Sequence, residues 1–191
     1  VDIAKYLPSY AGIQLNSEVE ALKKITTNIL KPITFIMGGS KISSKIDIIK
    51  NLIPKFNNII FIGGMANNIL KFKGFNIGKS FYEEKCKGIV EQIFFLAKKN
   101  KCEIIYPIDI AVGKNFKDSS RYKIPEETEE DDLILDIGPK TINNIKSIIQ
   151  KSKTILWNGP AGYFENKNFS KGSFEIAKEI SENTKSKNIY S

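Results

Sequence analysis

Short apolar runs alternate with longer amphipathic segments along most of this chain. The runs are rich in Ile, Leu and Phe and end in turn residues, which is typical of strands buried on both faces of a parallel sheet. We expect five such strands, at Ile33–Met37, Ile59–Ile62, Glu103–Ile108, Leu133–Asp136 and Thr154–Trp157. Strands that alternate with helices across short joints predict an α/β fold, a three-layer, Rossmann-like, doubly wound parallel sheet.

The segments between the runs have the periodicity of amphipathic helices. In Glu84–Asn100, Ile89, Ile93 and Leu96 recur at helical spacing, with Lys and Glu on the opposite face. We expect helices at Ser17–Leu30, Ser43–Leu52, Met65–Lys73, Glu84–Asn100, Thr141–Lys151 and Phe169–Asn183. The charged segment Val112–Asp132 interrupts this order and is predicted to be a surface excursion.

The composition narrows the classes of function. With 191 residues, 41% of them apolar and 26% charged, the chain has the make-up of one globular domain. No apolar stretch approaches the roughly 18 residues of a membrane span. The sequence has no His, which excludes Ser-His and Cys-His catalysis and zinc sites that use His. We expect Cys86 and Cys102 to be reduced, as in a cytoplasmic protein.

The net charge of +8 invites a nucleic-acid interpretation, which the residue types disfavour. Arg121 is the single arginine among 29 basic residues, and the lysines are scattered along the whole chain. Nucleic-acid surfaces use clustered arginines, because the planar guanidinium suits both phosphates and base edges. The chain also begins without Met or a signal-peptide pattern, so we expect it to be part of a longer protein.

The turns that follow most of the strands contain glycine, and they indicate a ligand site. In an open parallel sheet, ligands bind beyond the carboxyl ends of the strands. We expect one edge of the sheet to hold the turns after Met37, Ile62, Asp136 and Trp157. The first turn lacks both the dinucleotide fingerprint G-x-G-x-x-G and the P-loop pattern G-x-x-x-x-G-K-[ST]. These absences disfavour a nicotinamide or flavin enzyme and a P-loop protein.

Two lysines follow the first glycine turn. Lys41 and Lys45 are four positions apart and therefore share one face of the first helical turn. Two cations at a helix N-terminus are unfavourable by themselves, whereas free helix amides and lysines together suit a polyphosphate. A glycine turn with two solvated lysines is equally consistent with these residues. In the acidic run Glu126–Asp132, Asp131 and Asp132 would suit a metal, but a solvated charge run is the favoured interpretation.

The strings MGGSKISSKI, IGGMANNILKFKGFNIGKS, LDIGPKTI and ILWNGPAGYFE, in this order and spacing, resemble the C-terminal domain of phosphoglycerate kinase. The resemblance runs from Leu7–Gly12 to the last residue. It implies that residues 1–14 are the end of an interdomain hinge region and that residues 15–191 are a nucleotide-binding domain. This domain would be truncated before its last strand and its last phosphate loop, and Lys187–Ser191 would be the first half of that strand.

On the phosphate side, the resemblance assigns roles to lysines and glycines. Lys41 and Lys45 match the family lysines that hold the nucleotide phosphates and the phosphoryl group in transit, so they are the expected catalytic residues. Gly39, Gly63 and Gly64 match backbone positions that line the adenine and phosphate groove.

On the base side, Phe81 and Leu135 match positions that flank the adenine. Asn158 and Pro160 belong to the loop that closes over the nucleotide, and Glu165 matches the carboxylate that binds the ribose. The sequence departs from the family pattern by having Ile62 and Ile134 where relatives place glycine, and both substitutions would narrow the base pocket.

The reaction implied by the resemblance is reversible phosphoryl transfer from 1,3-bisphosphoglycerate to MgADP, giving ATP and 3-phosphoglycerate. Mg²⁺ would arrive with ADP or ATP, with no metal ligand in this segment. The site for 3-phosphoglycerate or 1,3-bisphosphoglycerate would lie in the family's N-terminal domain, so we expect this segment alone to be inactive. We also expect a cytoplasmic monomer that binds neither nucleic acid nor membrane. The alternatives are a non-catalytic module for nucleotides or sugar phosphates and a basic nucleic-acid-binding domain.

Overall fold

The computed structural model describes residues 6–8, 10, 12–17, 19–20 and 30–187, and the chain divides into two compact units, Val1–Leu30 and Lys31–Ser191. In the first unit, residues 13–17 are helical, and the amide of Asn16 donates to the carbonyl of Gly12 at 3.0 Å. Most of the helix expected at Ser17–Leu30 lies outside the described residues. So do residues 188–191 of the strand expected at Lys187–Ser191, whereas Lys187 itself is helical.

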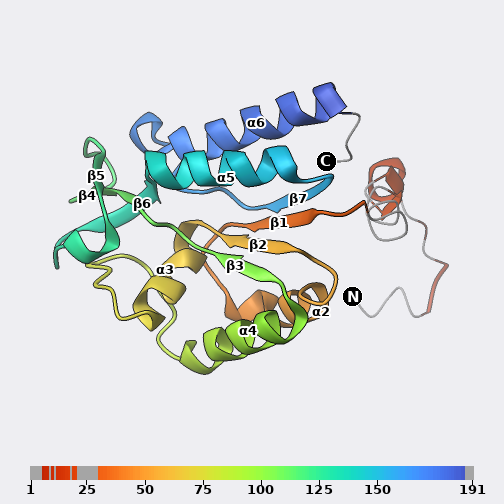
Figure 1. Ribbon diagram of the computed structural model, residues 1–191, viewed down its shortest axis with the longest axis horizontal. Helices are drawn as coiled ribbons and strands as arrows, with labels where there is room; N and C mark the ends of the chain where they lie inside the picture. Colours follow the sequence, from red (N-terminus) through yellow and green to blue (C-terminus); the bar gives the residue numbers. More distant parts are fainter. Residues whose placement is uncertain (1–5, 9, 11, 18, 21–29, 188–191) are drawn as a thin grey trace. The chain divides into compact units, whose positions relative to one another are not determined.

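In the described part of the second unit, a parallel sheet has four strands in the order β3-β2-β1-β7 (Figure 1). The strands are β1 (Ile33–Met37), β2 (Asn58–Phe61), β3 (Glu103–Ile105) and β7 (Thr154–Asn158). Met37 at the end of β1 lies opposite Phe61 of β2 and Asn158 of β7. The carboxyl ends of these three strands therefore coincide, as expected for a sheet that binds a ligand at that edge.

Helices cover both faces of this sheet (Figure 1). One face carries α2 (Ile46–Leu52) and α4 (Lys87–Asn100), and α3 (Gly63–Phe72) packs against α4. The other face carries α5 (Pro139–Lys151) and α6 (Lys171–Lys187), which pack against each other. The three-layer α/β fold expected from the alternating pattern is confirmed.

Isoleucine forms most of the core between the sheet and α5 and α6. The buried cluster includes Ile36, Ile60, Ile62, Ile137, Ile142, Ile145, Ile149, Ile155 and Ile176. Each such side chain contributes about 2 kcal/mol when it leaves water. Cys86 and Cys102 are free and buried, and burial raises the pKa of the Cys102 thiol to about 11. Among the described residues, no helix has both the length and the apolar character needed to cross a membrane.

The prediction of five parallel strands is wrong for the part of the chain that the structure describes. The strand β6 (Leu133–Ile137) belongs to a second, antiparallel sheet with the order β5-β4-β6. Its partner is β4 (Ile110–Gly113), which also pairs with β5 (Arg121–Lys123). The segment expected to be an irregular excursion therefore contains a hairpin that pairs with β6.

The strand expected at Glu103–Ile108 is also shorter than predicted. It ends at Ile105, two residues before Pro107. Proline has no amide hydrogen to donate to a neighbouring strand, so a run that continues into proline rarely extends the ladder. The chain passes Pro107 and then enters β4 in the second sheet.

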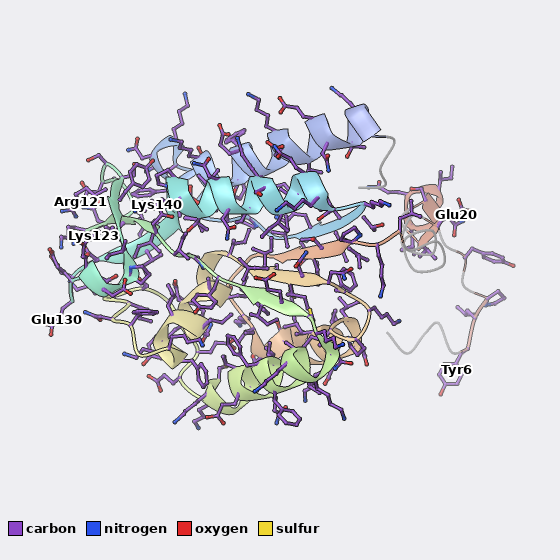
Figure 2. The ribbon with its side chains drawn as sticks, viewed as in Figure 1. Tyr6, Glu20, Arg121, Lys123, Glu130 and Lys140 are labelled. Atoms are coloured by element: carbon purple, nitrogen blue, oxygen red, sulfur yellow. The ribbon has the colours of Figure 1, made fainter. Side chains whose placement is uncertain are left out.

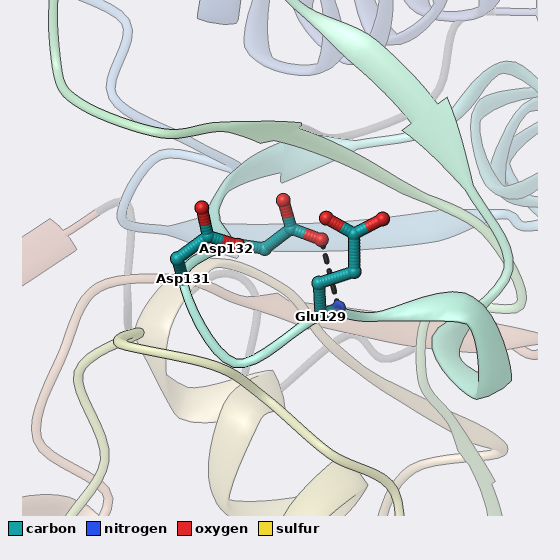
Figure 3. A group of neighbouring side chains, drawn as sticks. All are labelled: Glu129, Asp131 and Asp132. Atoms are coloured by element: carbon teal, nitrogen blue, oxygen red, sulfur yellow. Dashed lines mark hydrogen bonds between the residues drawn. The ribbon is translucent and has the colours of Figure 1, made fainter.

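The acidic run after β5 forms an ion-pair network around Asp132. Figure 3 shows its carboxylates, those of Glu129, Asp131 and Asp132. The side chain of Asp132 is fully buried, and its Oδ2 accepts hydrogen bonds from Lys123 Nζ at 2.8 Å and from the amide of Glu129 at 2.9 Å. The Nζ of Lys114 lies 2.9 Å from Asp132 Oδ1 and also pairs with Glu129 and Asp131. The expectation of a solvated charge run is therefore wrong for Asp132.

The same carboxylates have the spacing of a metal site, but cations of the protein already neutralise them. The carboxylate oxygens of Glu129, Asp131 and Asp132 lie within 4.8 Å of one another. Lys123 extends from β5 beside Arg121, whose Nη2 is 3.8 Å from Asp132 Oδ1 (Figure 2). The cluster thus fastens β5 to the start of β6 through ion pairs.

Replacing Asp132 with Asn is expected to destabilise the fold by about 1–3 kcal/mol at pH 7. Burial raises the pKa of the Asp132 carboxyl, but the hydrogen bonds from Lys123 and the Glu129 amide outweigh burial and lower it to about 2. A lowered folded-state pKa contributes stability above pH 4, which is lost as the pH falls from about 4 to 2. Denaturant unfolding at several pH values should show that the difference in unfolding free energy between wild type and variant decreases as the pH falls from about 4 to 2. The exposed neighbour Glu130, changed to Gln, is the control, and equal effects of the two changes would contradict the network.

Candidate functional site

A pocket of about 720 Å³ opens at the carboxyl edge of the parallel sheet. Its lining comes from the turn after β1, the start of α3, the strand β6 and the loop after β7. This volume is within the range of small-molecule sites. Although β6 belongs to the second sheet, its residues reach the same pocket as the turns of the parallel sheet. The expectation that the glycine turns share one edge of one sheet agrees with the structure for the turns after β1, β2 and β7, and it is wrong for the turn after β6, which follows a strand of the second sheet.

The turns around the pocket pack backbone against backbone. A Cβ on Gly38 would lie 2.2 Å from the carbonyl oxygen of Pro160, so no side chain fits where the turns after β1 and β7 meet. Gly63, which begins α3, has φ +61°, a left-handed conformation that favours glycine. The amide of Met65 donates to the carbonyl of Gly39 at 2.8 Å and joins α3 to the first turn. These contacts bring the backbone of α3 to the pocket wall.

The helix start after β1 does not have the free amides expected beside Lys41 and Lys45. A 3-10 turn, η2 (Ser43–Lys45), precedes α2. Oε2 of Glu83 accepts hydrogen bonds from the amide of Ile42 at 2.6 Å and from the amide of Ser43 at 3.0 Å. The expectation that a ligand phosphate binds these amides is therefore wrong, because a carboxylate of the protein already occupies that position.

Carboxylates also cap the helix starts of α5 and α6. Asp109 accepts hydrogen bonds from the amides of Lys140 and Thr141 in the first turn of α5. Asp136 accepts one from the amide of Gly172 in the first turn of α6. The start of α3 differs, because it lines the pocket and, among the described residues, no carboxylate accepts a hydrogen bond from the amides of Gly63 and Gly64. The partial positive charge of this helix start therefore faces the pocket, where an anion would be stabilised.

Most residues singled out by the family resemblance meet in this pocket. Those in its lining are Gly39, Gly63, Gly64, Phe81, Leu135, Pro160 and Glu165. The remaining residues, Lys41, Lys45 and Asn158, are not among the described residues of the lining, and Lys45 Nζ donates to Asn158 Oδ1. Of the two departures from the family pattern, Ile134 lines the pocket, whereas Ile62 is fully buried in the core.

Aromatic side chains form one wall of this pocket, and they are not among the site residues expected from the sequence. The ring centroids of Phe116 and Tyr163 are 5.2 Å apart in an edge-to-face arrangement. Both rings line the pocket, as does Phe164. The carbonyl of Phe116 accepts a hydrogen bond from Asn166 Nδ2 at 2.7 Å, which fixes the β4–β5 loop to the loop after β7. Aromatic faces suit a planar base. Tyr163 and Phe164 stand within a motif already noted, but Phe116 lies in the charged segment and gives no comparable signal.

Asp136 is a buried carboxylate in the pocket wall. Besides its bond to Gly172, it accepts a hydrogen bond from the amide of Ile137 at 2.9 Å. A Cβ on Gly162 or Gly172 would come within 2.7 and 2.3 Å of its Oδ1, so the carboxylate is packed tightly between the loop after β7 and α6. Burial raises the pKa of this carboxyl to about 6, although the two backbone hydrogen bonds partly oppose the rise.

Changing Asp136 to Asn should alter the pH dependence of stability. A carboxyl whose folded-state pKa is about 6, against 3.8 in the unfolded chain, contributes stability below pH 4 that is lost as the pH rises to 6. Relative to the variant, the wild type should therefore lose about 2–3 kcal/mol of unfolding free energy between pH 4 and pH 7. Urea unfolding across this range measures the change, with Glu91→Gln on the exposed side of α4 as the control. A difference between wild type and variant that is constant with pH would contradict this expectation.

Fold and pocket together define an α/β protein with a ligand site at the carboxyl edge of parallel strands. The family model for phosphoglycerate kinase matches residues 1–191. Phosphoglycerate kinase of Wolbachia pipientis wMel is 43% identical over 185 residues, which are 95% of this chain and 46% of that protein. The enzyme of Zymomonas mobilis is 38% identical over 191 residues, 99% of this chain and 48% of that protein.

Solved structures agree with these sequence matches. The structure of phosphoglycerate kinase from Coxiella burnetii has a TM-score of 0.85 and 34% identity, and the match covers 90% of this chain and 45% of that chain. The structure from Pyrococcus horikoshii has a TM-score of 0.76 at 25% identity. This chain belongs to the phosphoglycerate kinase family. It spans about half the length of the curated relatives that it matches.

Proposed function

We propose that this chain forms the nucleotide-binding part of a phosphoglycerate kinase. The reaction is reversible transfer of a phosphoryl group from 1,3-bisphosphoglycerate to MgADP, which gives ATP and 3-phosphoglycerate in glycolysis. The observation that carries the proposal is the pocket of about 720 Å³, in which motif residues from distant parts of the chain meet. Membership of the family supplies the reaction, and the pocket supplies a site of suitable size and chemistry for one of its substrates.

The chemistry of the pocket suggests how a nucleotide is oriented. The base lies against apolar and aromatic side chains, with Phe81 and Leu135 near Tyr163. Glu165, at the end of the loop after β7, accepts hydrogen bonds from the ribose hydroxyls. The phosphates point to the start of α3, where the backbone of Gly63 and Gly64 and the helix dipole favour negative charge. Mg²⁺ is part of the substrate MgADP and enters with it.

Lys41 and Lys45 act through their side chains in this proposal. Because Glu83 caps the adjacent helix start, the lysine ammonium groups rather than the backbone amides supply positive charge at that side. Lys45 is held at the end of β7 by its hydrogen bond to Asn158. Phosphoryl transfer depends mainly on positioning and on stabilising charge, and fixed ammonium groups contribute to both.

The phosphoglycerate site is proposed to lie in the part of the family's length that this chain does not span. Catalysis by the family then requires both parts, since the two substrates must be brought into contact and shielded from water. The same proposal includes a cytoplasmic monomer whose partners are ADP or ATP and phosphoglycerate. A non-catalytic nucleotide-binding module is the second candidate, which the same pocket would serve equally well.

The 191-residue chain is expected to bind MgADP with a dissociation constant no tighter than about 1 mM and to form no ATP. Binding is weak because only part of the contacts of a closed kinase is present, and turnover is absent because the second substrate has no site. Titration of MgADP followed by nuclear magnetic resonance measures the affinity, and a coupled assay measures ATP formation. ATP formation above background, or micromolar affinity for MgADP, would contradict the proposal that this chain binds the nucleotide weakly and needs the rest of the kinase for catalysis. Lack of any binding would exclude nucleotide binding by this chain.

In the full-length kinase, Lys41→Ala should lower kcat on the order of 10²-fold, because a charge placed near the transferring group is lost. Lys45→Ala should chiefly weaken nucleotide binding, since its side chain bridges to Asn158 beside the pocket. Steady-state kinetics of both variants give kcat and KM separately. Lys55→Ala, an exposed lysine after α2, is the matched control. If Lys41→Ala and Lys45→Ala both behave like the wild type and the control, the two lysines have no role in the reaction.

A further inference from the structure

The segment between α3 and α4 contributes to the pocket although it has little regular structure. Lys79, Ser80 and Phe81 line the pocket. Two asparagines of α3 hold this segment from one side. Asn67 Nδ2 donates to the carbonyl of Phe81 at 3.0 Å, and the amide of Glu83 donates to Asn68 Oδ1 at 2.8 Å. The position of the Phe81 wall is therefore set partly by α3.

Asn68 also reaches the glycine turn at the start of α3. Its Nδ2 donates to the carbonyl of Gly64 at 3.2 Å, and its side chain is buried. The side chain of Asn68 therefore bonds both to the pocket-lining Gly64 and to Glu83. This arrangement leaves the carboxylate of Glu83 directed away from α3 toward the loop after β1.

The carboxylate of Glu83 holds the loop after β1 from the other side. It accepts hydrogen bonds from the amides of Ile42 and Ser43 through Oε2 and from Ser43 Oγ at 2.5 Å through Oε1. Burial raises the pKa of this carboxyl, but the hydrogen bonds from Ser43 and Ile42 outweigh it and keep the pKa below the usual value. Glu83 is therefore ionised at neutral pH, and its bonds are of the strong, charge-assisted kind.

Glu83 caps the start of this 3-10 turn from a distant position in the sequence. The cap therefore also joins two segments of the chain, which a local cap does not do. The N-cap residue Ile42 has no side chain that can bond to these amides. A Ser or Asp at that position would bond to amides further into the same turn and would touch no other segment. Instead the bond spans 41 positions of the chain and connects two walls of the pocket.

We propose that Glu83 is a positioning residue for nucleotide binding, which fixes the loop carrying Gly39 and Lys41 relative to the wall carrying Phe81. The inference rests on the proposed function, because it assigns the base to one wall and phosphate chemistry to the other. A ligand that contacts both walls binds better when their spacing is fixed beforehand, since less order is lost on binding. MgADP should therefore depend on Glu83 more than adenosine, which lacks the phosphates.

The test compares Glu83→Gln with Glu84→Gln, an exposed neighbouring carboxylate, in the 191-residue chain. Gln preserves the size of the side chain and removes its charge. In Glu83→Gln, the amides of Ile42 and Ser43 should exchange hydrogen about tenfold faster, and those of Ser80 and Cys86 should also exchange faster. The dissociation constant for MgADP should rise roughly 3- to 10-fold, while that for adenosine should change less than about twofold. Ser43→Ala, which removes one partner, should produce smaller changes in the same direction.

Each outcome decides the proposal. Faster exchange in both segments, together with a selective loss of MgADP affinity, supports it. Faster exchange confined to Ile42 and Ser43, or equal losses for MgADP and adenosine, shows an ordinary cap and overturns it. Identical behaviour of Glu83→Gln and Glu84→Gln overturns it as well. If the wild type binds no MgADP, the proposed function fails, and exchange at Ser80 and Cys86 alone decides whether Glu83 joins the two walls.

Discussion

The pocket depends on the close approach of backbones at the carboxyl edge of the parallel sheet. Gly38 touches the carbonyl of Pro160, and Gly39 accepts a hydrogen bond from the first turn of α3. A single side chain at these contacts would separate the turns after β1 and β7 and move the start of α3 away from its neighbours. The strand register ends β1, β2 and β7 at one level. This register and the glycine turns are both required for the backbones to approach closely at that edge.

Negative side chains determine which helix starts remain available around that edge. Glu83, Asp109 and Asp136 each satisfy backbone amides at the beginning of a helix or 3-10 turn. Although the chain has a net charge of +8, these three acids lie where helix dipoles favour negative charge. The start of α3 faces the pocket without such a carboxylate from its N-cap residue. An anion at the start of α3 would therefore meet less competition from carboxylates of the protein than at the other helix starts.

The fold layers, the parallel strands and the glycine turns could be predicted because they follow from local periodicity and from turn residues. The pairing of β6 could not, since a short apolar run does not reveal its partner, and Ile110–Gly113 is inconspicuous beside a charged segment. The family motifs identified most of the pocket lining. They gave no indication of Phe116, whose role depends on the hairpin, or of Glu83, whose contacts lie 41 positions away. The spacing predicted that Lys41 and Lys45 share the first helical turn, but the 3-10 turn begins at Ser43, after Lys41, and the pattern did not reveal the carboxylate of Glu83.

Residues that depend on two different hydrogen-bonded sheets line the pocket. Leu135 lies in β6, and Phe116 follows β4, so both depend on the antiparallel ladder. Gly39 and Gly63 follow β1 and β2 of the parallel ladder. The lining of the pocket therefore depends on two ladders that share no strand, and a shift of either ladder would move part of that lining.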